Sequence, residues 1–515
     1  MHPPRLRISS TISLSVVGRA IALLFAAALA WASEARAAEL LAGVAKVDIT
    51  DHEAGPVNDP LYVKALVLKY GTDTVAIITV DAVAIGEIGR IKNTYLTDVR
   101  SQLAGELQIK PSHVLVNASH CHGVVCTDVE RRTVEAVKAA AKELVPVRVG
   151  VGVGHEDRIM ENRRLILKDG READVRRAYS LPRDEDVAAV GPIDPQIGLL
   201  RLDRADGRTL AVVYNFACHP IQGVPNGGNT ADYPAFASRV IEEHYGHGAL
   251  ALFVQGCGGD INPINYKDVH HRQDAEPLGN LLGLSVVRAL NQVKSHEIDR
   301  FQVVNEMLSL PRGADLESRM ASIEAETARL VKSLKGTSLN FKTFMPLYVQ
   351  YKLNADFPTT HSHRYLQDKS LARDDLAKLD AQNRADLEAY VRNIHTMEEI
   401  SKLQTNLALL KKHHAQNVAA GTNTIDVEIA GLRIGEFRLV TFPGELTAEI
   451  GLNIKKRAGA PYTFVAGYTN GYIYYAPTEK QRRNAGYAQE DCDSLVGPAW
   501  QPLFEDRVAQ ILKKL

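Results

Sequence analysis

The chain has 515 residues, with 60 basic and 61 acidic side chains and 45% hydrophobic residues. This composition is that of an ordinary globular protein with a sizeable core, and the length leaves room for about two to four average domains. The neutral charge balance gives no sign of a nucleic-acid partner or of an acidic partner, so we expect no nucleic-acid function.

Residues 1–38 differ from the rest of the chain. Three arginines precede an apolar run from Ile21 to Ala32, and Ala35-Arg36-Ala37 follows as a small-x-small signal. This pattern predicts a secretory signal peptide cut near Ala37 or Ala38. A membrane anchor is the alternative, but the run is short for a span, and no other stretch approaches a transmembrane length. We therefore expect a secreted or periplasmic protein with no stable membrane span.

The cysteines do not form the pattern of a disulfide scaffold. Five are present, at Cys121, Cys126, Cys218, Cys257 and Cys492. Because five is odd, at least one is free or pairs between chains. A bridge between two of Cys121, Cys218 and Cys257, which lie beside the motifs below, is left open.

Between the signal peptide and residue 311, short apolar runs alternate with helical stretches. Tyr62 to Tyr70 and Val75 to Val83 predict a strand pair, and Asp206-Gly207 predicts a hairpin between the two apolar runs that flank it. Other expected elements are helices at 91–107 and 133–144 and strands at 114–116 and 147–153. This alternation predicts an α/β (α+β) layered domain with mixed β-sheets.

Residues 312–417 are charged and lack the strand pattern. Apolar residues at helical spacings between Leu376 and Leu410 predict an amphipathic helix, and Leu316 to Leu334 predicts a second one. We expect a helical-hairpin insertion packed on the main domain. It contains His361 and His363, which are interpreted as surface loop histidines rather than as metal ligands.

Strand patterns return after the insertion, at Thr424–Ala430, Leu432–Phe442 and Thr463–Tyr468. The main domain is therefore predicted to comprise residues 39–311 and 418–515, and to close around the insertion. The chain shows no repeats and no low-complexity tract.

Two histidines, His120 and His122, follow the predicted buried strand Val114 to Val116. If the backbone stays extended there, both side chains point to the same side. Neutral imidazole is the commonest protein ligand for zinc, so the pair is a candidate part of a metal site. The alternative is a pair of exposed or hydrogen-bonded histidines without a metal.

Three later motifs supply further ligand types. His219 ends the apolar run of Tyr214 to Pro220, and Glu445 follows Pro443-Gly444 on a tight turn. The segment Tyr468 to Tyr475 holds four tyrosines in eight residues. Two histidines, a glutamate and one more oxygen or nitrogen ligand make a four-coordinate zinc site of the catalytic type.

Taken together and in order, these motifs resemble the catalytic domain of the neutral (non-lysosomal) ceramidase family. The resemblance spans roughly Leu41 to Trp500. Its matching segments are Ser119-His120-Cys121-His122-Gly123, Asn162-Arg163-Arg164, Phe216-Ala217-Cys218-His219-Pro220, Ala231-Asp232-Tyr233-Pro234, Gly258-Gly259-Asp260-Ile261-Asn262-Pro263, Pro443-Gly444-Glu445 and Asn470 through Thr478.

The resemblance implies a zinc amidohydrolase with Zn2+ as its cofactor. The residues that it implies as metal ligands are His120, His219, Glu445 and Tyr475. It also implies that His122 and Arg163 contact the substrate.

The chain departs from the family at the segment Gly-Asp-x-Ser-Pro, whose serine is proposed as the catalytic residue. Here the segment reads Gly-Asp-Ile-Asn-Pro, and Asn262 has no nucleophilic oxygen. The family's C-terminal immunoglobulin-like domain has no matching segment in this chain. The helical insertion of this chain has no matching segment in the family. These departures put ceramide itself in doubt as the substrate.

A metal-based mechanism needs no protein nucleophile, because zinc lowers the pKa of a bound water to about 7 and polarises a carbonyl. Asn262 is then a candidate hydrogen-bond donor to a developing oxyanion, and His122 a candidate general acid or base. Arg163 is a candidate holder of a carboxylate or polar head group. Asp260 either caps the segment after it or orients a ligand.

The sequence thus predicts an exported zinc-dependent hydrolase in which zinc-bound water attacks an amide-type bond of a small or lipid-like substrate. Two alternatives stay open. One is hydrolysis of an ester or a glycoside at the same metal site, because a fold does not determine a reaction. The other is a non-catalytic binding protein. The oligomeric state is unknown at this stage.

Overall fold

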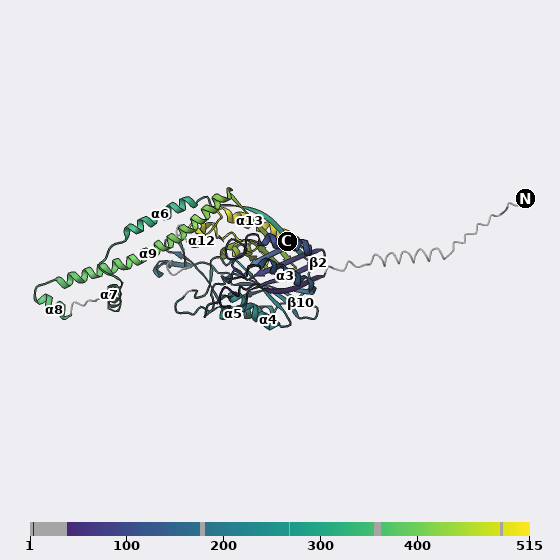
Figure 1. Cartoon of the computed structure of the whole chain (residues 1–515), viewed down its shortest axis with the longest axis horizontal. Helices are drawn as coiled ribbons and strands as arrows, with labels where there is room; N and C mark the ends of the chain where they lie inside the picture. The colour runs from purple at the N-terminus through teal and green to yellow at the C-terminus, as the bar shows by residue number, and fades with distance from the viewer. Residues whose placement is uncertain (1–3, 5–38, 176–180, 267, 355–361, 485–487) are drawn as a thin grey trace.

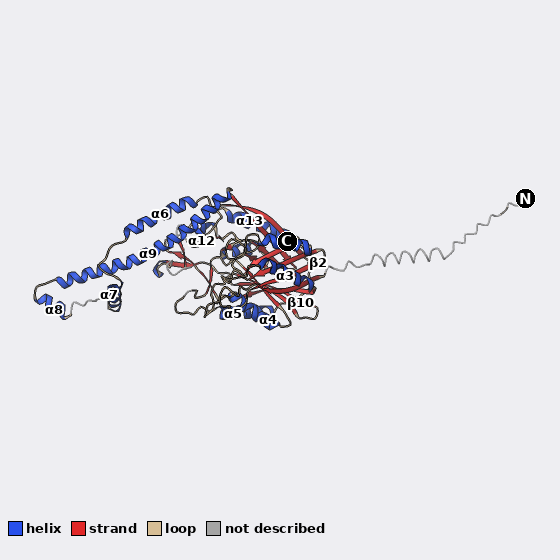
Figure 2. Ribbon diagram, viewed as in Figure 1, coloured by secondary structure: helices blue, strands red, loops and turns tan. Residues whose placement is uncertain are grey.

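The computed structural model describes residues 4, 39–175, 181–266, 268–354, 362–484 and 488–515. The predicted signal peptide lies outside the described residues, apart from Pro4, and stays a prediction. Figure 1 shows a body that holds the strands and a long helical arm that extends from it. Figure 2 shows the same division, with all strands in the body.

The larger sheet has eight strands in the order β12-β11-β10-β5-β1-β2-β3-β4. Its β12–β11 and β3–β4 pairs are parallel and the other pairs are antiparallel, so the sheet is mixed as predicted. The predicted strand pair and hairpin are both confirmed. The strands are β1 (Leu40–Asp48), β2 (Tyr62–Tyr70), β3 (Asp73–Val80), β4 (Val114–Ala118), β5 (Val145–His155), β10 (Gln196–Arg204), β11 (Thr209–Phe216) and β12 (Leu250–Gln255).

The second sheet has four strands in the order β14-β15-β16-β18. Its strands are β14 (Phe301–Pro311), β15 (Thr424–Ile434), β16 (Phe437–Thr441) and β18 (Thr463–Ala466). The prediction of one strand over Leu432–Phe442 is wrong. Gly435 has a φ of 58° and turns the chain, so that Ile434 and Phe437 face each other across an antiparallel hairpin.

The two sheets pack face to face and helices cover their outer faces. The alternation along β2 shows this arrangement, because Leu66 and Leu68 lie in the core between the sheets while Val63, Ala65 and Val67 lie in the core under helices. The larger sheet is covered by α2 (Tyr95–Leu107), α3 (Val129–Lys142), α4 (Asp232–Tyr245) and α5 (Ala275–Leu290), and the smaller one by α10 (Ala448–Ala458) and α13 (Trp500–Lys514). The predicted layered α/β fold with mixed sheets is therefore confirmed.

Short strands and helices occupy the connections between the main strands and helices. Two small sheets pair β6 (Met160–Asn162) with β13 (Ile261–Pro263) and β17 (Glu445–Leu446) with β19 (Tyr475–Ala476). A third consists of β7 (Arg164–Leu167), β8 (Glu172–Asp174) and β9 (Val187–Val190). The short helices are η1 (Pro111–His113), η3 (Asp184–Asp186), α11 (Glu479–Arg482) and α12 (Gln489–Cys492).

Among the described residues, the arm consists of four helices between the two halves of the body. They are α6 (Leu316–Ser333), α7 (Phe341–Leu353), α8 (His363–Ser370) and α9 (Asp375–Ala420). α6 and α9 lie side by side and share a core that includes Ile323 and Leu403, as a helical hairpin requires. α7 and α8 lie at the far end of the arm (Figure 1). The assignment of residues 312–417 as a separate insertion stays a prediction.

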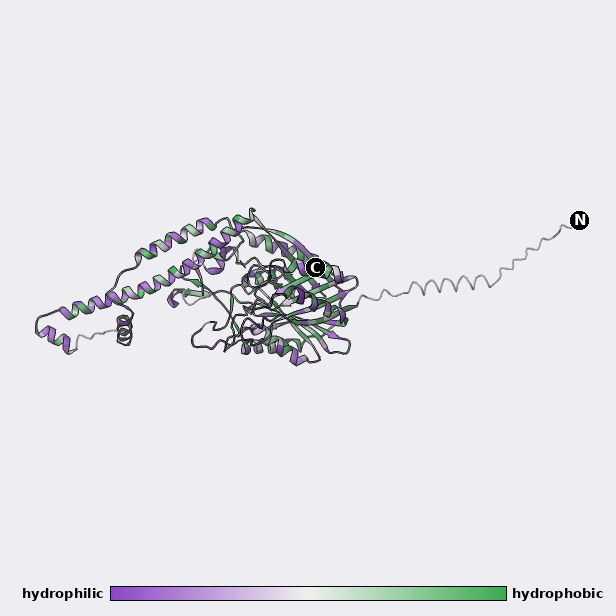
Figure 3. Cartoon of the chain, viewed as in Figure 1, coloured by the Kyte–Doolittle hydropathy of each residue, from purple (hydrophilic) through white to green (hydrophobic). Residues whose placement is uncertain are grey.

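Two further predictions can be compared with the described residues. All five cysteines lie among them and are free thiols, so the bridge that the sequence left open is not formed. No helix within the described part of the chain is both long enough and apolar enough to cross a membrane. The longest helix, α9, mixes polar and apolar residues along its whole length (Figure 3).

Candidate metal centre

The carboxyl ends of β4 and β12, the two edge strands of the larger sheet, lie next to each other. The backbone N–H of Gln255, at the end of β12, donates to Oδ1 of Asn117 on β4 over 2.8 Å. The twisted sheet thus coils so that its two edges approach each other at this end. This approach places His120, just after β4, beside His219, just after β11, with their ring centroids 4.8 Å apart.

His120 turns into the protein. Its φ of 69° is left-handed, so the backbone does not stay extended through the His-x-His segment. As a result His120 is buried while His122 is exposed, and the two rings lie 5.5 Å apart edge to face. Nδ1 of His120 lies 2.6 Å from the carbonyl oxygen of Val83, to which it donates. Burial lowers the pKa of His120 to about 4, against the opposing charge of Glu445.

His219 is held in the same way by a different carbonyl. Its Nδ1 lies 3.0 Å from the backbone oxygen of Ile261, and its side chain is buried. The two Nε2 atoms point at one carboxylate oxygen, since Oε2 of Glu445 lies 3.1 Å from that of His219 and 3.6 Å from that of His120.

Glu445 is a buried carboxylate with two tyrosine partners. The hydroxyl of Tyr468 donates to Oε2 over 3.1 Å, and the hydroxyl of Tyr472 donates to Oε1. Burial opposes ionisation, but the two imidazoles when they are protonated, together with the Tyr472 hydrogen bond, hold the pKa of Glu445 well below its usual range. The glutamate therefore keeps its negative charge in the interior.

These three side chains fit a metal ion. Because each Nδ1 donates to a carbonyl, the neutral rings present Nε2 lone pairs toward the carboxylate. Such a group of acceptors, facing one another in the interior, is stabilised by a cation among them. Within the described part of the chain, the ligand atoms of His120, His219 and Glu445 all lie within 4.8 Å of one another. The group can therefore hold a metal.

Tyr475 lies beside this group. It is the strand partner of Glu445 in the small parallel sheet of β17 and β19, and its side chain is buried. Its hydroxyl accepts a hydrogen bond from Nη2 of Arg163 over 3.3 Å. The structure thus brings the fourth predicted ligand to the same place, and its role as a ligand stays a prediction.

Arg163 is buried and bound to groups of the protein. Its Nε donates to Oε1 of Glu490 over 2.7 Å, and its Nη1 donates to Oδ1 of Asn262 over 3.1 Å. Burial opposes its charge, but Glu490 and other nearby acidic groups hold the pKa of Arg163 well above its usual value. The guanidinium therefore fixes Asn262 and Tyr475, and its predicted contact with substrate stays a prediction.

Asp260 and Asn262 lie on either side of β13's first residue, and both are buried. Oδ1 of Asp260 accepts from the backbone N–H of Ala448 over 2.8 Å, at the start of α10. Asp260 thus caps a helix that follows Glu445, rather than the segment after itself in the chain. Burial raises the pKa of Asp260. Neither predicted catalytic role is tested by these contacts.

Close packing of backbones fixes the turn that carries Glu445. Gly259 donates its N–H to the carbonyl of Leu446 over 2.8 Å. A Cβ atom on Gly259 would lie 2.7 Å from the carbonyl oxygen of Glu445, so a larger residue does not fit. The glycine before Asp260 is therefore required for the two turns to meet.

Sequence reasoning missed several residues that hold the site together. The carbonyls of Val83 and Ile261 carried no signal, because any residue presents a backbone oxygen. Tyr468 and Tyr472 belonged to the tyrosine-rich segment, but nothing in its pattern showed that they bind Glu445. Glu490 had no recognisable motif.

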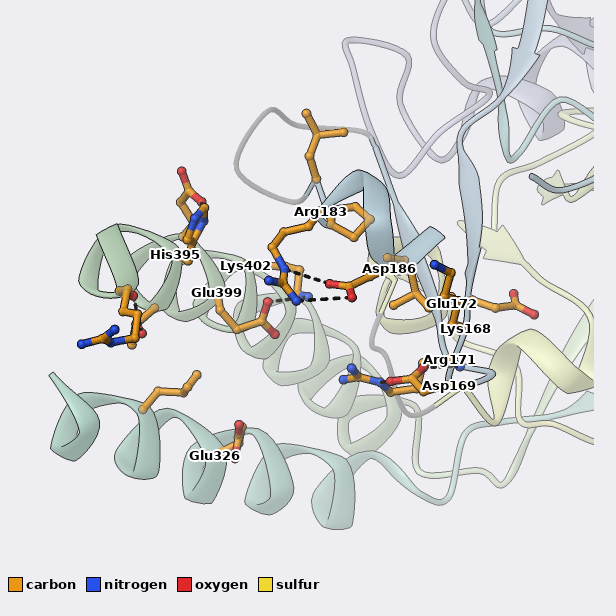
Figure 4. Close-up of a pocket in the computed structure, with 18 of the residues that line it drawn as sticks. Lys168, Asp169, Arg171, Glu172, Arg183, Asp186, Glu326, His395, Glu399 and Lys402 are labelled. Atoms are coloured by element: carbon orange, nitrogen blue, oxygen red, sulfur yellow. Dashed lines mark hydrogen bonds and ion pairs between the residues drawn. The ribbon is translucent and has the colours of Figure 1, made fainter. Parts of the chain in front are cut away.

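A separate cleft of roughly 720 Å3 lies between the small sheet of β7 to β9 and the helices α6 and α9 (Figure 4). None of the metal-site residues lines it. Its charged side chains pair with one another, as Arg183 does with Asp186 at 3.0 Å and Arg171 with Asp169 at 2.7 Å. Because the charges of these pairs offset each other, the cleft offers a ligand no region of one predominant charge.

Comparison with known proteins bears on the fold. No family model and no curated protein sequence matches the chain. The crystal structure of neutral ceramidase from Pseudomonas aeruginosa superposes with a TM-score of 0.56 at 16% identity, over 93% of this chain and 75% of that one. A structure of ceramidase complexed with C2 gives a TM-score of 0.57 at 14% identity, over 93% and 76% of the two chains.

Proposed function

Since the chain has the fold of the neutral ceramidases, we propose that it is an exported zinc-dependent hydrolase that cleaves an amide-type bond in a small or lipid-like substrate. The observation that carries the proposal is the convergence of His120, His219 and Glu445 in a buried group that can hold a metal. Burying such a group without a cation costs free energy, and buried groups of this kind mark candidate functional sites.

We propose that His120, His219, Glu445 and Tyr475 bind the metal through two imidazole nitrogens and two oxygens. A set of four nitrogen and oxygen donors suits zinc. When bound, zinc supplies Lewis-acid chemistry, polarising a carbonyl and easing the deprotonation of water. The carbonyls of Val83 and Ile261 orient the two imidazoles, as partners behind metal-binding histidines do.

Roles toward the substrate are assigned to His122, Asn262 and Arg163, and a supporting role to Asp260. His122 is exposed beside His120, so it can exchange a proton between the leaving group and solvent. Because Oδ1 of Asn262 accepts from Arg163, its amide nitrogen is the end that can donate to a developing oxyanion. Arg163 adds a positive charge that favours a carboxylate or polar head group on the substrate. Asp260 anchors the turn of Glu445 through α10.

The proposal is tested by elemental analysis of the purified protein together with a screen of amide, ester and glycoside substrates. We expect one zinc per chain and hydrolysis of amides. If the protein hydrolyses only esters or glycosides, the proposed reaction is wrong and the proposed metal site stands. A zinc-free protein that binds lipid amides without turnover would contradict the proposed function.

A further inference from the structure

The far end of the arm carries an apolar helix face that is open to solvent. Phe341, Met345, Val349 and Leu353 recur every four residues along α7, which places them on one side of the helix. Their exposed fractions are 67%, 38%, 46% and 83%. We call these four residues the apolar stripe. Large apolar side chains gathered in this way usually mark an interaction site.

The stripe is held outward because the opposite face of α7 is docked on α9. The ring of Phe344 stacks on Tyr390 with centroids 4.3 Å apart, and the guanidinium of Arg384 lies 5.2 Å from the ring centroid of Tyr351. Phe344 is 4% exposed. The helix therefore cannot bury the stripe against the arm without losing these contacts.

The charge of the segment that carries the stripe has one sign. Residues 331–354 contain four lysines, Lys332, Lys335, Lys342 and Lys352, and no acidic residue. All four lysines are exposed, and two of them belong to α7 itself. The helix even begins without a carboxylate, since Asn340 provides the cap by accepting from the N–H groups of Lys342 and Thr343. This segment is complementary to a negatively charged surface.

We propose that α7 docks the arm onto an anionic lipid surface. The stripe would enter the boundary between head groups and acyl chains, while Lys342 and Lys352 stay among the head groups. The exposed side of α7 combines aromatic, aliphatic and lysine residues, as helices that lie in a membrane interface do. Its 13 residues extend about 20 Å, enough to lie flat on a bilayer.

A protein partner is less well matched. The stripe lies on a helix at the far end of the arm, and a protein partner would have to present a groove shaped to receive it. A lipid surface needs no complementary shape. The inference rests on the proposed function in one respect, because a protein that cleaves a lipid-like substrate would meet that substrate at the lipid surface. Binding to vesicles, however, can be measured without any turnover.

The test uses the mature protein with two kinds of vesicle, phosphatidylcholine alone and phosphatidylcholine mixed with phosphatidylglycerol. We expect co-sedimentation with the mixed vesicles, weakened by salt and by omission of the anionic lipid. Phe341→Ser with Leu353→Ser should lower the affinity on the order of tenfold or more. Lys342→Gln with Lys352→Gln should lower the affinity about 30-fold for the mixed, anionic vesicles, and should not change binding to phosphatidylcholine alone.

The matched control is Val418→Ser with Leu503→Ser, which removes two exposed apolar side chains that lie outside α7 and should leave binding unchanged. Circular dichroism and zinc content should be those of the wild type in every variant, so failure of the metal site is recognised separately. Absence of vesicle binding by the wild type, or equal binding by the stripe variant, overturns the proposal. So does a stripe-dependent dimer in size-exclusion chromatography without vesicle binding, since the stripe would then bind a second copy.

Discussion

Nε2 of His219 lies 3.1 Å from Oε2 of Glu445, and the two side chains are almost fully buried. Nδ1 of the same ring is occupied by the carbonyl of Ile261, so the ring can turn only one nitrogen toward the carboxylate. Nε2 of His219 is therefore the nitrogen that faces Glu445. A cation between the two side chains would satisfy both, and the predictions below follow from that geometry.

Replacing His219 should remove the metal. His219→Ala deletes one of the two imidazoles, and we expect zinc content and activity to be lost together. A chelator should lower the melting temperature of the wild type and leave that of the variant unchanged, because only the wild type gains stability from bound metal. His363→Ala, at the start of the exposed α8, is the matched control and should keep its zinc. Full zinc occupancy in His219→Ala would exclude the proposed site.

Asn262 should contribute to the rate and not to the metal. Loss of one oxyanion donor costs about 100- to 1,000-fold in turnover, so Asn262→Ala should fall in that range with normal zinc content. Asn262→Ser, which restores a hydroxyl, should recover part of the rate. Wild-type turnover in Asn262→Ala would refute its role as an oxyanion donor, and a trapped covalent acyl-enzyme in the wild type would refute a mechanism that needs no protein nucleophile.

Tyr472 should tune the metal through Glu445. Its hydroxyl donates to Oε1 of the carboxylate, and partners of this kind typically contribute about 10- to 100-fold in metal affinity. We expect Tyr472→Phe to weaken zinc binding by that factor in a competition with a chromophoric chelator. Tyr474→Phe is the matched control in the same segment, because its hydroxyl bonds to Glu87, away from the metal group. Equal affinities in the two variants would rule out this role for Tyr472.

Glu428 should make stability fall at acid pH. Burial opposes its ionisation, but Arg100, Asn305 and Asn470 hold the pKa of Glu428 below its ordinary value near 4.5. Arg100 donates to both of its oxygens, at 2.6 and 2.7 Å. A group with a lowered folded pKa contributes stability above the unfolded value and loses it as the pH falls through the folded value.

Glu428→Gln should therefore be less stable than the wild type at pH 7, by about 2–3 kcal/mol as judged by urea unfolding. Below the unfolded pKa of the glutamate the difference should shrink, because the wild-type carboxyl then also becomes protonated. Glu135→Gln, in an exposed pair with Arg131, serves as the control and should change little. A difference between Glu428→Gln and the wild type that stays constant down to pH 3 would contradict the linkage.

The outer part of the arm should be removable without loss of the metal site. Backbone N–H of Lys335 lies 3.2 Å from Oδ1 of Asn393, so a short glycine-serine linker can replace residues 336–392. The core that α6 shares with α9 at Leu330 and Ile400 is kept. We expect normal zinc content, unchanged hydrolysis of water-soluble amides and loss of vesicle binding. Loss of zinc in this folded variant would show that the outer arm supports the metal site.

Deleting the whole insertion is a harsher change. His413 of α9 lies 2.7 Å from Asp493, and Arg319 of α6 donates to the carbonyl of Arg482 over 2.7 Å. The base of the arm is thus tied to the segment that follows Tyr475. We expect replacement of residues 312–417 to change the range of substrates more than the zinc content, as a comparison of kcat/KM across a substrate panel would show. Unchanged selectivity would mean that the insertion does not shape the entrance.

The sequence by itself determined the main elements of the chain. Alternating apolar runs and the Asp206-Gly207 turn predicted most strands of the larger sheet, though not β1 or β12, and helical spacing predicted α9. The motifs at His120, His219 and Glu445 also stood out, because each directly follows a strand pattern. These signals are local, since strand and helix periodicity are properties of a few consecutive residues.

The tertiary structure alone decided how those parts act on one another. The left-handed backbone at His120 separates it from His122, and the turn at Gly435 divides a run that reads as one strand. The carbonyls of Val83 and Ile261 and the hydroxyls of Tyr468 and Tyr472 lie far along the chain from the side chains that they orient. Hydrogen bonds between distant segments depend on the path of the whole chain, and no short window of sequence encodes that path.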